Sequence, residues 1–138
     1  KGNDLQLEAQ EISTHCISYL REKGFKTYDG DFSKINFEKQ YDIVTAWHVV
    51  EHVQDIQSLA KQVAKITKKY FIVEVPMAAG GNGGYGRNPN TYKKGFNGHY
   101  HFFTKESMIH LFKDYFKTVR KNKAIQGGEY SLQLIFEK

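Results

Sequence analysis

The chain has 138 residues, of which 40% are hydrophobic, 25% charged and 14% aromatic. This length suits one domain that buries about two-thirds of the surface of its unfolded chain, so we expect a self-supporting core. No apolar run approaches the roughly 18 residues of a membrane span, which excludes a helical membrane-spanning protein. The single cysteine, Cys16, excludes an internal disulfide. Because no secretory signal is apparent either, we expect a reducing, cytoplasmic location.

The formal net charge of +5 is unevenly spread. Residues 87–123 hold nine Lys and Arg against two Asp and Glu, whereas the rest of the chain is nearly neutral. Aromatic residues interleave with this charge, as they do in nucleic-acid binders: Tyr92, Phe96, Tyr100, Phe102 and Phe103. A solvated face beside a partly buried aromatic cluster is the simpler explanation, so nucleic acid is not the expected partner.

The first part of the chain predicts a strand, a helix and a second strand. Apolar and polar residues alternate over residues 5–11, which is typical of a strand, and a helical pattern follows over residues 13–24. Residues 25–28 predict a second short strand, which ends in the turn-forming Asp-Gly-Asp of residues 29–31.

The middle of the chain predicts a buried strand over residues 41–47, a helix and a further strand over residues 70–75. Asp55 is a suitable N-cap for the helix, whose expected apolar face is Ile56, Leu59, Val63 and Ile66. The C-terminal end of this helix is expected to carry cations that suit the helix dipole: Lys65, Lys68 and Lys69.

Residues 77–98 differ in kind, because they contain seven glycines and Pro89 and too little apolar surface for a packed element. We expect a long loop, and loops of this length are usually functional or disordered.

Thr104 is the expected N-cap of a last helix, whose apolar face is Met108, Leu111, Phe112 and Tyr115. Strands over residues 117–125 and 130–136 follow, joined through Gly127-Gly128 as a hairpin. The whole order predicts an α/β fold with an open, Rossmann-like mixed sheet flanked by helices, mostly parallel with an antiparallel C-terminal hairpin. Ligands are expected beyond the carboxyl ends of the strands.

Three stretches carry the most specific patterns. They are residues 41–55, in which a strand ending is followed by Val-Glu-His-Val, residues 71–76 (FIVEVP) and residues 99–104 (HYHFFT). With them the chain resembles the class I S-adenosylmethionine-dependent methyltransferases, close to the branch of the quinone-biosynthesis methyltransferases. The resemblance covers essentially the whole chain. It implies one methyltransferase domain over residues 1–138, which transfers a methyl group from S-adenosylmethionine to an O, N or C nucleophile of a small acceptor.

The resemblance also implies cofactor-binding positions. Glu11 stands where the family binds the ribose hydroxyls, and a carboxylate can accept two such hydrogen bonds. Asp31, after Gly30, matches the acid that meets the adenine amino group, with Phe32 near the ring. Trp47 falls where the family contacts the cofactor after a later strand. A simple turn former at Asp31 and core packing at Trp47 are the structural alternatives.

One part of the family pattern is not found. The first strand and its Gly-x-Gly loop should precede Glu11 by about 20 residues. A literal Gly-x-Gly-x-x-Gly occurs at Gly81, Gly83 and Gly86, but it leads into Arg87 instead of opening a helix. The resemblance therefore implies a domain that is incomplete at its N terminus, and we expect these residues alone to bind S-adenosylmethionine poorly.

His48-x-x-Glu51-His52 has the spacing of the inverted zinc-peptidase motif. The motif follows a buried strand and continues with β-branched residues that start a helix poorly, so a metallopeptidase is our third and least favoured interpretation. Some methyltransferases resembling this chain hold a divalent metal with Glu-x-x-Glu-His at this position. Here His48 replaces the first Glu, and His99 or His101 could complete the set. An ordinary polar cluster is favoured over a metal, so no metal ligand is predicted.

Methyl transfer by in-line displacement requires that the protein position the reactants and accept a proton from the nucleophile. His48, His52 or His101 could be the base, because imidazole titrates near neutral pH. Residues 77–103 are expected to form an acceptor-side loop or lid, whose positive charge favours an anionic acceptor.

A non-catalytic, degenerate methyltransferase fold that binds protein or RNA is the alternative function. The missing Gly-rich strand favours this alternative, whereas the presence of Glu11 and Asp31 argues against it.

Overall fold

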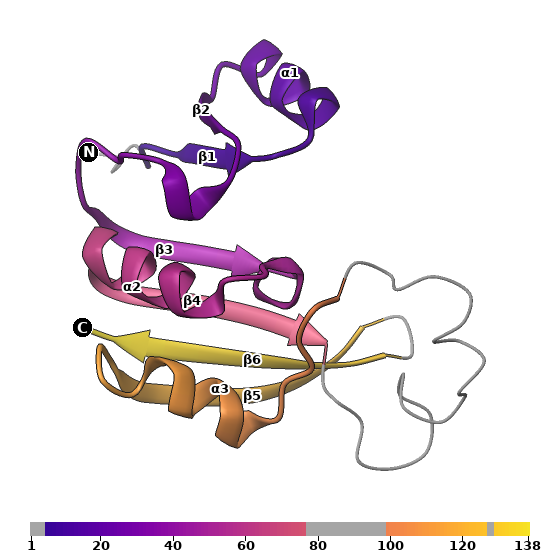
Figure 1. Cartoon of the computed structure of the whole chain (residues 1–138), viewed down its shortest axis with the longest axis vertical. Helices are drawn as coiled ribbons and strands as arrows, with labels where there is room; N and C mark the ends of the chain where they lie inside the picture. Colours follow the sequence, from indigo (N-terminus) through magenta and orange to yellow (C-terminus); the bar gives the residue numbers. More distant parts are fainter. Residues whose placement is uncertain (1–4, 77–98, 127–128) are drawn as a thin grey trace. The chain divides into compact units, whose positions relative to one another are not determined.

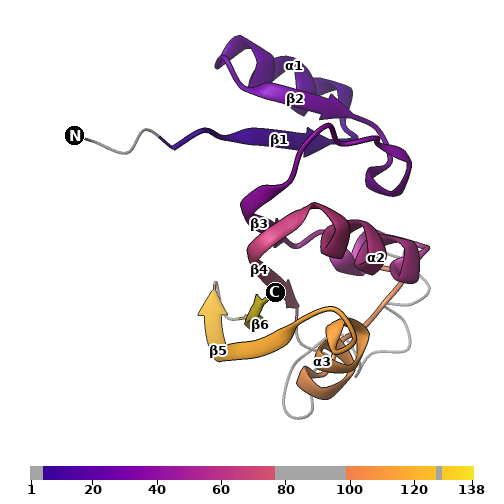
Figure 2. The same cartoon turned by 90° about the vertical axis from the view of Figure 1, so that its left-hand side faces the viewer.

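The computed structural model describes residues 5–76, 99–126 and 129–138. The chain divides into two compact units, Lys1–Glu38 and Lys39–Lys138. Each unit combines strands and helices (Figures 1 and 2). The expected loop over residues 77–98, its glycine motif and the Gly127-Gly128 turn lie outside the described residues. None of the described helices is long and apolar enough to cross a membrane.

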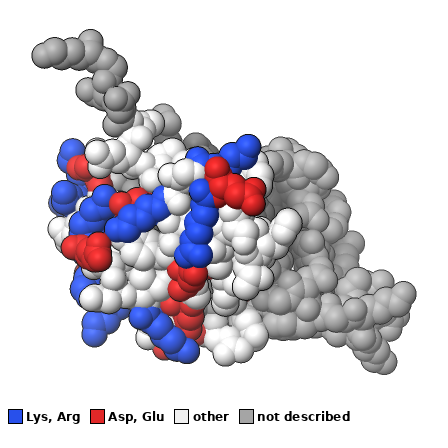
Figure 3. All heavy atoms as spheres, turned by 90° about the horizontal axis from the view of Figure 1, so that it is seen from above, with Lys and Arg blue, Asp and Glu red and all other residues white. Residues whose placement is uncertain are grey.

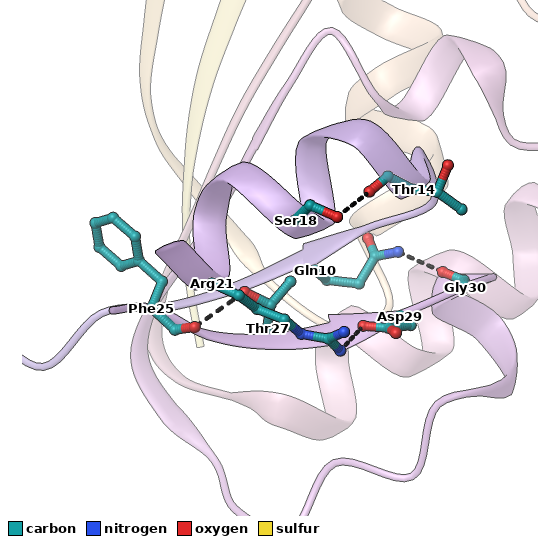
Figure 4. Close-up of polar contacts among 8 residues, drawn as sticks. All are labelled: Gln10, Thr14, Ser18, Arg21, Phe25, Thr27, Asp29 and Gly30. Carbon is teal, nitrogen blue, oxygen red and sulfur yellow. Dashed lines mark hydrogen bonds and ion pairs between the residues drawn. The ribbon is translucent and has the colours of Figure 1, made fainter. Parts of the chain in front are cut away.

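The first unit holds a small parallel sheet and one helix. Its elements are β1 (Glu8–Glu11), α1 (Thr14–Glu22), β2 (Lys26–Asp29) and the 3₁₀ turn η1 (Phe32–Lys34). Strands β1 and β2 pair in parallel, with Glu8 opposite Lys26 and Glu11 opposite Asp29. Arg21 of α1 forms an ion pair with Asp29, and Gln10 of β1 donates a hydrogen bond to the carbonyl of Gly30 (Figure 4). These contacts tie the helix and the turn to the sheet.

Strand β1 is shorter than the strand that the alternating pattern of residues 5–11 predicts. Leu5 and Leu7 lie ahead of β1 and are 83% and 61% exposed. The partner strand β2 has only four residues, so the ladder pairs residues 8–11 alone. Helix α1 ends at Glu22, close to the expected stop at Gly24, whose φ of +84° is a conformation that glycine adopts at little cost.

The second unit is a four-stranded mixed sheet with two helices. Its elements are β3 (Tyr41–Trp47), the 3₁₀ turn η2 (Val50–His52), α2 (Ile56–Ile66), β4 (Thr67–Pro76), α3 (Lys105–Phe112), β5 (Lys117–Gln126) and β6 (Glu129–Glu137). The strand order is β3-β4-β6-β5, with β3 and β4 parallel and the other pairs antiparallel. Helices α2 and α3 lie on the same face of this sheet (Figures 1 and 2). The expected mixed α/β fold with an antiparallel C-terminal hairpin is confirmed.

The core of this unit lies between the sheet and the two helices. Phe71 of β4 is fully buried, and its ring centroid lies 5.0 Å from that of Phe112 in α3 and 6.1 Å from that of Phe136 in β6. Because side chains alternate along a strand, Glu74 points away from the face that carries Phe71. It lies opposite Gln133 of β6. Strand β4 therefore supplies the core on one face and a polar pair on the other.

Both predicted N-caps are confirmed. The carboxylate of Asp55 accepts a hydrogen bond from the Ser58 N–H at 3.0 Å. Thr104 and Ser107 form a reciprocal capping box, in which the Thr104 hydroxyl accepts from the Ser107 N–H at 3.2 Å. Each cap fixes the first residue of its helix.

Two expectations about helix ends were wrong. Lys68 and Lys69 are not at the end of a helix, because α2 ends at Ile66 and β4 begins at Thr67 without a loop. The hydroxyl of Thr67 donates to the Val63 carbonyl at 2.7 Å and so closes the last turn. Tyr115 is not on the buried face of α3, because the helix ends at Phe112 and Tyr115 is 39% exposed.

Charged side chains of both signs are interspersed on the face drawn in Figure 3. Exposed ion pairs occur in both units: Lys26 Nζ lies 3.1 Å from a Glu38 oxygen in the first, and Lys69 Nζ lies 3.0 Å from an Asp42 oxygen in the second. Exposed pairs of this kind each contribute roughly 0–1 kcal/mol.

The buried cluster of Phe71, Phe112, Phe116 and Phe136 allows a prediction about stability. Phe71→Ala should lower the free energy of unfolding by about 3–5 kcal/mol, because it opens a cavity between three other rings. Ile43→Ala on the neighbouring strand is the control. Its side chain is 53% exposed, so the loss should stay below about 1 kcal/mol. Urea denaturation followed by circular dichroism measures both, and equal losses would contradict this assignment of the core.

Candidate functional site

Two acidic residues predicted to bind a cofactor, Glu11 and Asp31, lie at the carboxyl ends of the strands in the first unit, called the acidic edge below. Strand β1 ends at Glu11, and β2 ends opposite it at Asp29, so the carboxyl ends of these parallel strands meet there. The N–H of Gly30 donates to the carbonyl of Glu11 at 3.0 Å. This bond, with the positive φ of Gly30 (96°), turns the chain so that Asp31 follows at the same edge. Glu11 and Asp31 thus both lie where the two parallel strands end.

The Glu11 carboxylate is held by the turn that follows it. Its Oε1 accepts hydrogen bonds from the N–H groups of Ile12 at 2.7 Å and Ser13 at 2.9 Å. Within the described part of the chain its Oε2 accepts none. One oxygen therefore orients the group, while the other is able to accept a hydrogen bond from a ligand.

Asp31 has a structural role of its own. Its Oδ1 accepts from the Ser33 hydroxyl at 2.8 Å and the Ser33 N–H at 3.0 Å, and so caps η1. These bonds, with Lys34 nearby, hold the pKa of Asp31 below its usual 3.8. The turn-forming role is therefore real. The carboxylate is exposed and stays charged at neutral pH.

Phe32 belongs to a small aromatic cluster, because its ring centroid lies 5.3 Å from that of Phe37. The Phe37 ring in turn lies 4.8 Å from that of Tyr28 in β2. Ring packing of this kind fixes the Phe32 side chain beside Asp31.

The second unit gathers histidines and buried acids after β3. Trp47, the last residue of β3, is 48% exposed, so core packing does not account for it. His48 follows with a φ of 51°, a left-handed conformation that is uncommon outside glycine. Its N–H donates to the carbonyl of Glu74 at 2.9 Å, which anchors the strained residue to β4.

Two buried carboxylates flank the His48 ring. Nδ1 lies 3.5 Å from Oε1 of Glu51, and Nε2 lies 3.5 Å from Oε1 of Glu74. Both acids are almost completely buried, whereas the His48 side chain is 45% exposed. Gln133 donates to the other oxygen of Glu74 at 3.2 Å. Sequence reasoning missed Glu74, although an acid within the apolar run of residues 71–75 was the available signal.

The segment that begins at His99 is fastened to the same turn. The N–H groups of Tyr100 and His101 donate to the carbonyl of Glu51 at 2.7 and 3.2 Å. The His101 ring is used locally, because its Nε2 lies 2.9 Å from the carbonyl oxygen of Val53. The His99 ring instead packs edge-on against His52, with centroids 4.6 Å apart.

The inverted zinc-peptidase geometry is not formed by this motif. That motif needs His48 and His52 on one face of an α-helix, but here His48 is left-handed and residues 50–52 form a single 3₁₀ turn.

The hydrogen bonds of Asp31 allow a prediction about the pKa of its carboxyl group. Ser33→Ala removes the hydroxyl donor and should raise the pKa of Asp31 toward 3.8. Because the pKa is lower in the folded state, the stabilisation exists above the unfolded value and is lost as the pH falls through the folded pKa. Carboxyl NMR titration measures the shift. Ser58→Ala, at the cap of α2, should leave it unchanged, and an unchanged value in Ser33→Ala would refute the cause.

Several solved structures that share this fold are described as methyltransferases. Magnesium protoporphyrin IX methyltransferase (ChlM) from Synechocystis PCC 6803, with bound SAH, superposes with a TM-score of 0.70 at 14% identity, over 94% of this chain and 62% of that chain. The N-methyltransferase NodS from Bradyrhizobium japonicum WM9, in complex with S-adenosyl-L-homocysteine, gives 0.71 at 11%, over 96% and 66%. An S-adenosylmethionine-dependent methyltransferase from Clostridium acetobutylicum ATCC 824 gives 0.64 at 12%, over 93% and 73%.

The chain thus spans less than two-thirds of the length of ChlM and NodS. No curated protein matches the sequence. A family model described as a methyltransferase domain matches residues 5–116, which include the acidic edge of the first unit and the histidine cluster of the second. The chain therefore belongs to this methyltransferase-domain family.

Proposed function

We propose that the protein transfers a methyl group from S-adenosylmethionine to an O, N or C nucleophile of a small acceptor. The observation that carries this proposal is the family match over residues 5–116. The ligands of ChlM and NodS, S-adenosyl-L-homocysteine in both, support S-adenosylmethionine as the cofactor.

The acidic edge of the first unit suits the adenosine part of this cofactor. Charged carboxylates only accept hydrogen bonds, and ribose hydroxyls and an adenine amino group are donors. We assign the ribose to Glu11, through its Oε2, and the amino group to Asp31, whose lowered pKa keeps it an acceptor at neutral pH. Phe32 would lie near the adenine ring. In the second unit the half-exposed Trp47 is our fourth candidate cofactor contact.

The bound cofactor supplies an electrophilic methyl group on a sulfonium, and the protein must take a proton from the nucleophile. Among His48, His52 and His101 we assign this role to His48. Glu74, held by Gln133, can accept the Nε2 proton of His48 and leave Nδ1 to receive one. The buried Glu51 carboxylate, 3.5 Å from Nδ1, would stabilise the imidazolium that forms. His101 fits less well because its Nε2 already contacts the Val53 carbonyl.

Residues 77–103 are our candidate for the acceptor-side lid, and the positive charge of residues 87–94 favours an anionic acceptor. In its described part, the Tyr100 and His101 bonds to Glu51 fasten the end of this segment beside the histidines.

Cofactor binding tests the assignment of Glu11 and separates the enzyme from a non-catalytic module. Calorimetric titration of the full-length protein with S-adenosylmethionine should give one site, and Glu11→Ala should weaken it at least about tenfold by removing two ribose hydrogen bonds. Glu22→Ala, an exposed acid of α1, is the matched control and should bind like the parent. Absence of binding by the parent would favour the protein-binding or RNA-binding module.

Proton transfer tests the assignment of His48. In an assay of S-adenosylhomocysteine release with a panel of small phenols, amines and carboxylic acids, His48→Ala should lower kcat by about 10²–10⁴. Affinity for the cofactor should not change. His110→Ala, an exposed histidine on α3, is the control. An unaltered kcat in His48→Ala would transfer the role to another residue.

A further inference from the structure

The side chain of Glu51 is the least satisfied polar group of the histidine cluster. It is 2% exposed, and in the described part of the chain neither carboxylate oxygen has a hydrogen-bond partner. A buried carboxylate without hydrogen bonds is costly unless a positive charge or a metal compensates it. This group therefore requires an explanation.

His48 does not fully compensate the charge of the buried Glu51 carboxylate. The His48 ring lies between Glu51 and Glu74, at 3.5 Å from each. Even as an imidazolium it carries one positive charge beside two carboxylates. A net negative charge then remains on the two buried carboxylates, which favours the binding of a cation.

Three metal-binding groups converge on this point. Ligand atoms of Glu51, His52 and His99 all lie within 4.8 Å of one another. They come from different places in the chain: two are neighbours on η2, and the third arrives with the segment that hydrogen-bonds to the Glu51 carbonyl. His101, the other candidate, is directed to the Val53 carbonyl instead.

The distances between these ligand atoms are close to the distances between ligands bound to one metal ion. With bonds of about 2.0–2.2 Å, ligands on one tetrahedral ion lie roughly 3.3–3.6 Å apart. His52 Nε2 is already 3.8 Å from Oε1 of Glu51. The His52 side chain is 41% exposed and Glu51 is buried, so small rotations of the His52 ring would close the remaining gap.

We propose that Glu51, His52 and His99 bind a divalent transition-metal ion of the zinc class. Two imidazoles and one carboxylate suit Zn²⁺, Co²⁺ or Fe²⁺, whereas Mg²⁺ and Ca²⁺ prefer oxygen ligands alone. Three protein ligands leave at least one coordination position open, and the exposed side of His52 puts that position within reach of solvent. His48 contacts the Glu51 carboxylate on one side and Glu74 on the other, and Glu74 is held by Gln133. These neighbours would orient Glu51 toward the metal.

The experiment is a metal titration of the untagged, full-length protein after chelator treatment. Zn²⁺ should raise the melting temperature and bind at one equivalent in calorimetry, and Co²⁺ should give visible absorption bands that Zn²⁺ abolishes. Mg²⁺ should do neither. These readouts need neither cofactor nor acceptor, so failure of the proposed methyl transfer would leave them unchanged.

Variants connect the binding to the three ligands. Glu51→Gln keeps the shape of the side chain but removes its charge, and it should weaken Zn²⁺ binding at least about a hundredfold. His99→Ala should have a similar effect, and it cannot disrupt a helix or strand because His99 lies in neither. His110→Ala is the control for loss of an unrelated histidine and should bind Zn²⁺ like the parent.

The proposal is overturned if one equivalent of Zn²⁺ gives no thermal shift and no heat. It is equally overturned if Glu51→Gln and His99→Ala, both folded by circular dichroism, bind Zn²⁺ as tightly as His110→Ala does. In either case the Glu51 charge is balanced by the neighbouring histidines alone.

Discussion

The hydrogen bonds to the backbone carbonyl of Glu51 organise the functional end of the second unit. This single oxygen accepts the N–H groups of Tyr100 and His101, which brings a segment from far along the chain to the turn after β3. The same residue sends its carboxylate inward, against His48 and His52. Backbone and side chain of one residue thus bring together groups from separate parts of the sequence. These hydrogen bonds and the contact between the His99 and His52 rings hold His99 beside η2.

The strain at His48 has a place in this arrangement. Its left-handed φ makes a sharp exit from β3, and the hydrogen bond to the Glu74 carbonyl offsets the cost, roughly 1–3 kcal/mol for such a conformation. The backbone distortion therefore aims one imidazole between two carboxylates that the sheet and η2 hold in place.

Much of the fold follows from local signals in the sequence. The bounds of β3 and the caps at Asp55 and Thr104 were predicted correctly, because an apolar run and a capping side chain are both local features. Strand β1 came out shorter because its length depends on its partner, which the alternation of apolar residues does not reveal. The direct passage from α2 into β4 was missed, since three lysines near that point, Lys65, Lys68 and Lys69, suggested a longer helix end.

The candidate site was harder to anticipate. The resemblance pointed to Glu11, Asp31 and the histidines, but it could not show that the His101 ring meets the Val53 carbonyl while the His99 ring packs against His52. Glu74 was overlooked because a strand pattern shows that a residue lies on the second face of a sheet, not what occupies that face. The roles of Glu11, Asp31, Phe32 and Trp47 toward a cofactor stay predictions.

The alternation along β4 also bears on what a substitution in this strand would change. Phe71 and its neighbours on the same face serve the core, whereas Glu74 and Gln133 serve the cluster beside His48. Adjacent positions of one strand therefore meet different physical demands, close packing on one face and hydrogen bonding on the other. Substitutions on the face of Phe71 should therefore act mainly through packing, whereas substitutions at Glu74 or Gln133 should act through the charge and hydrogen bonds around His48.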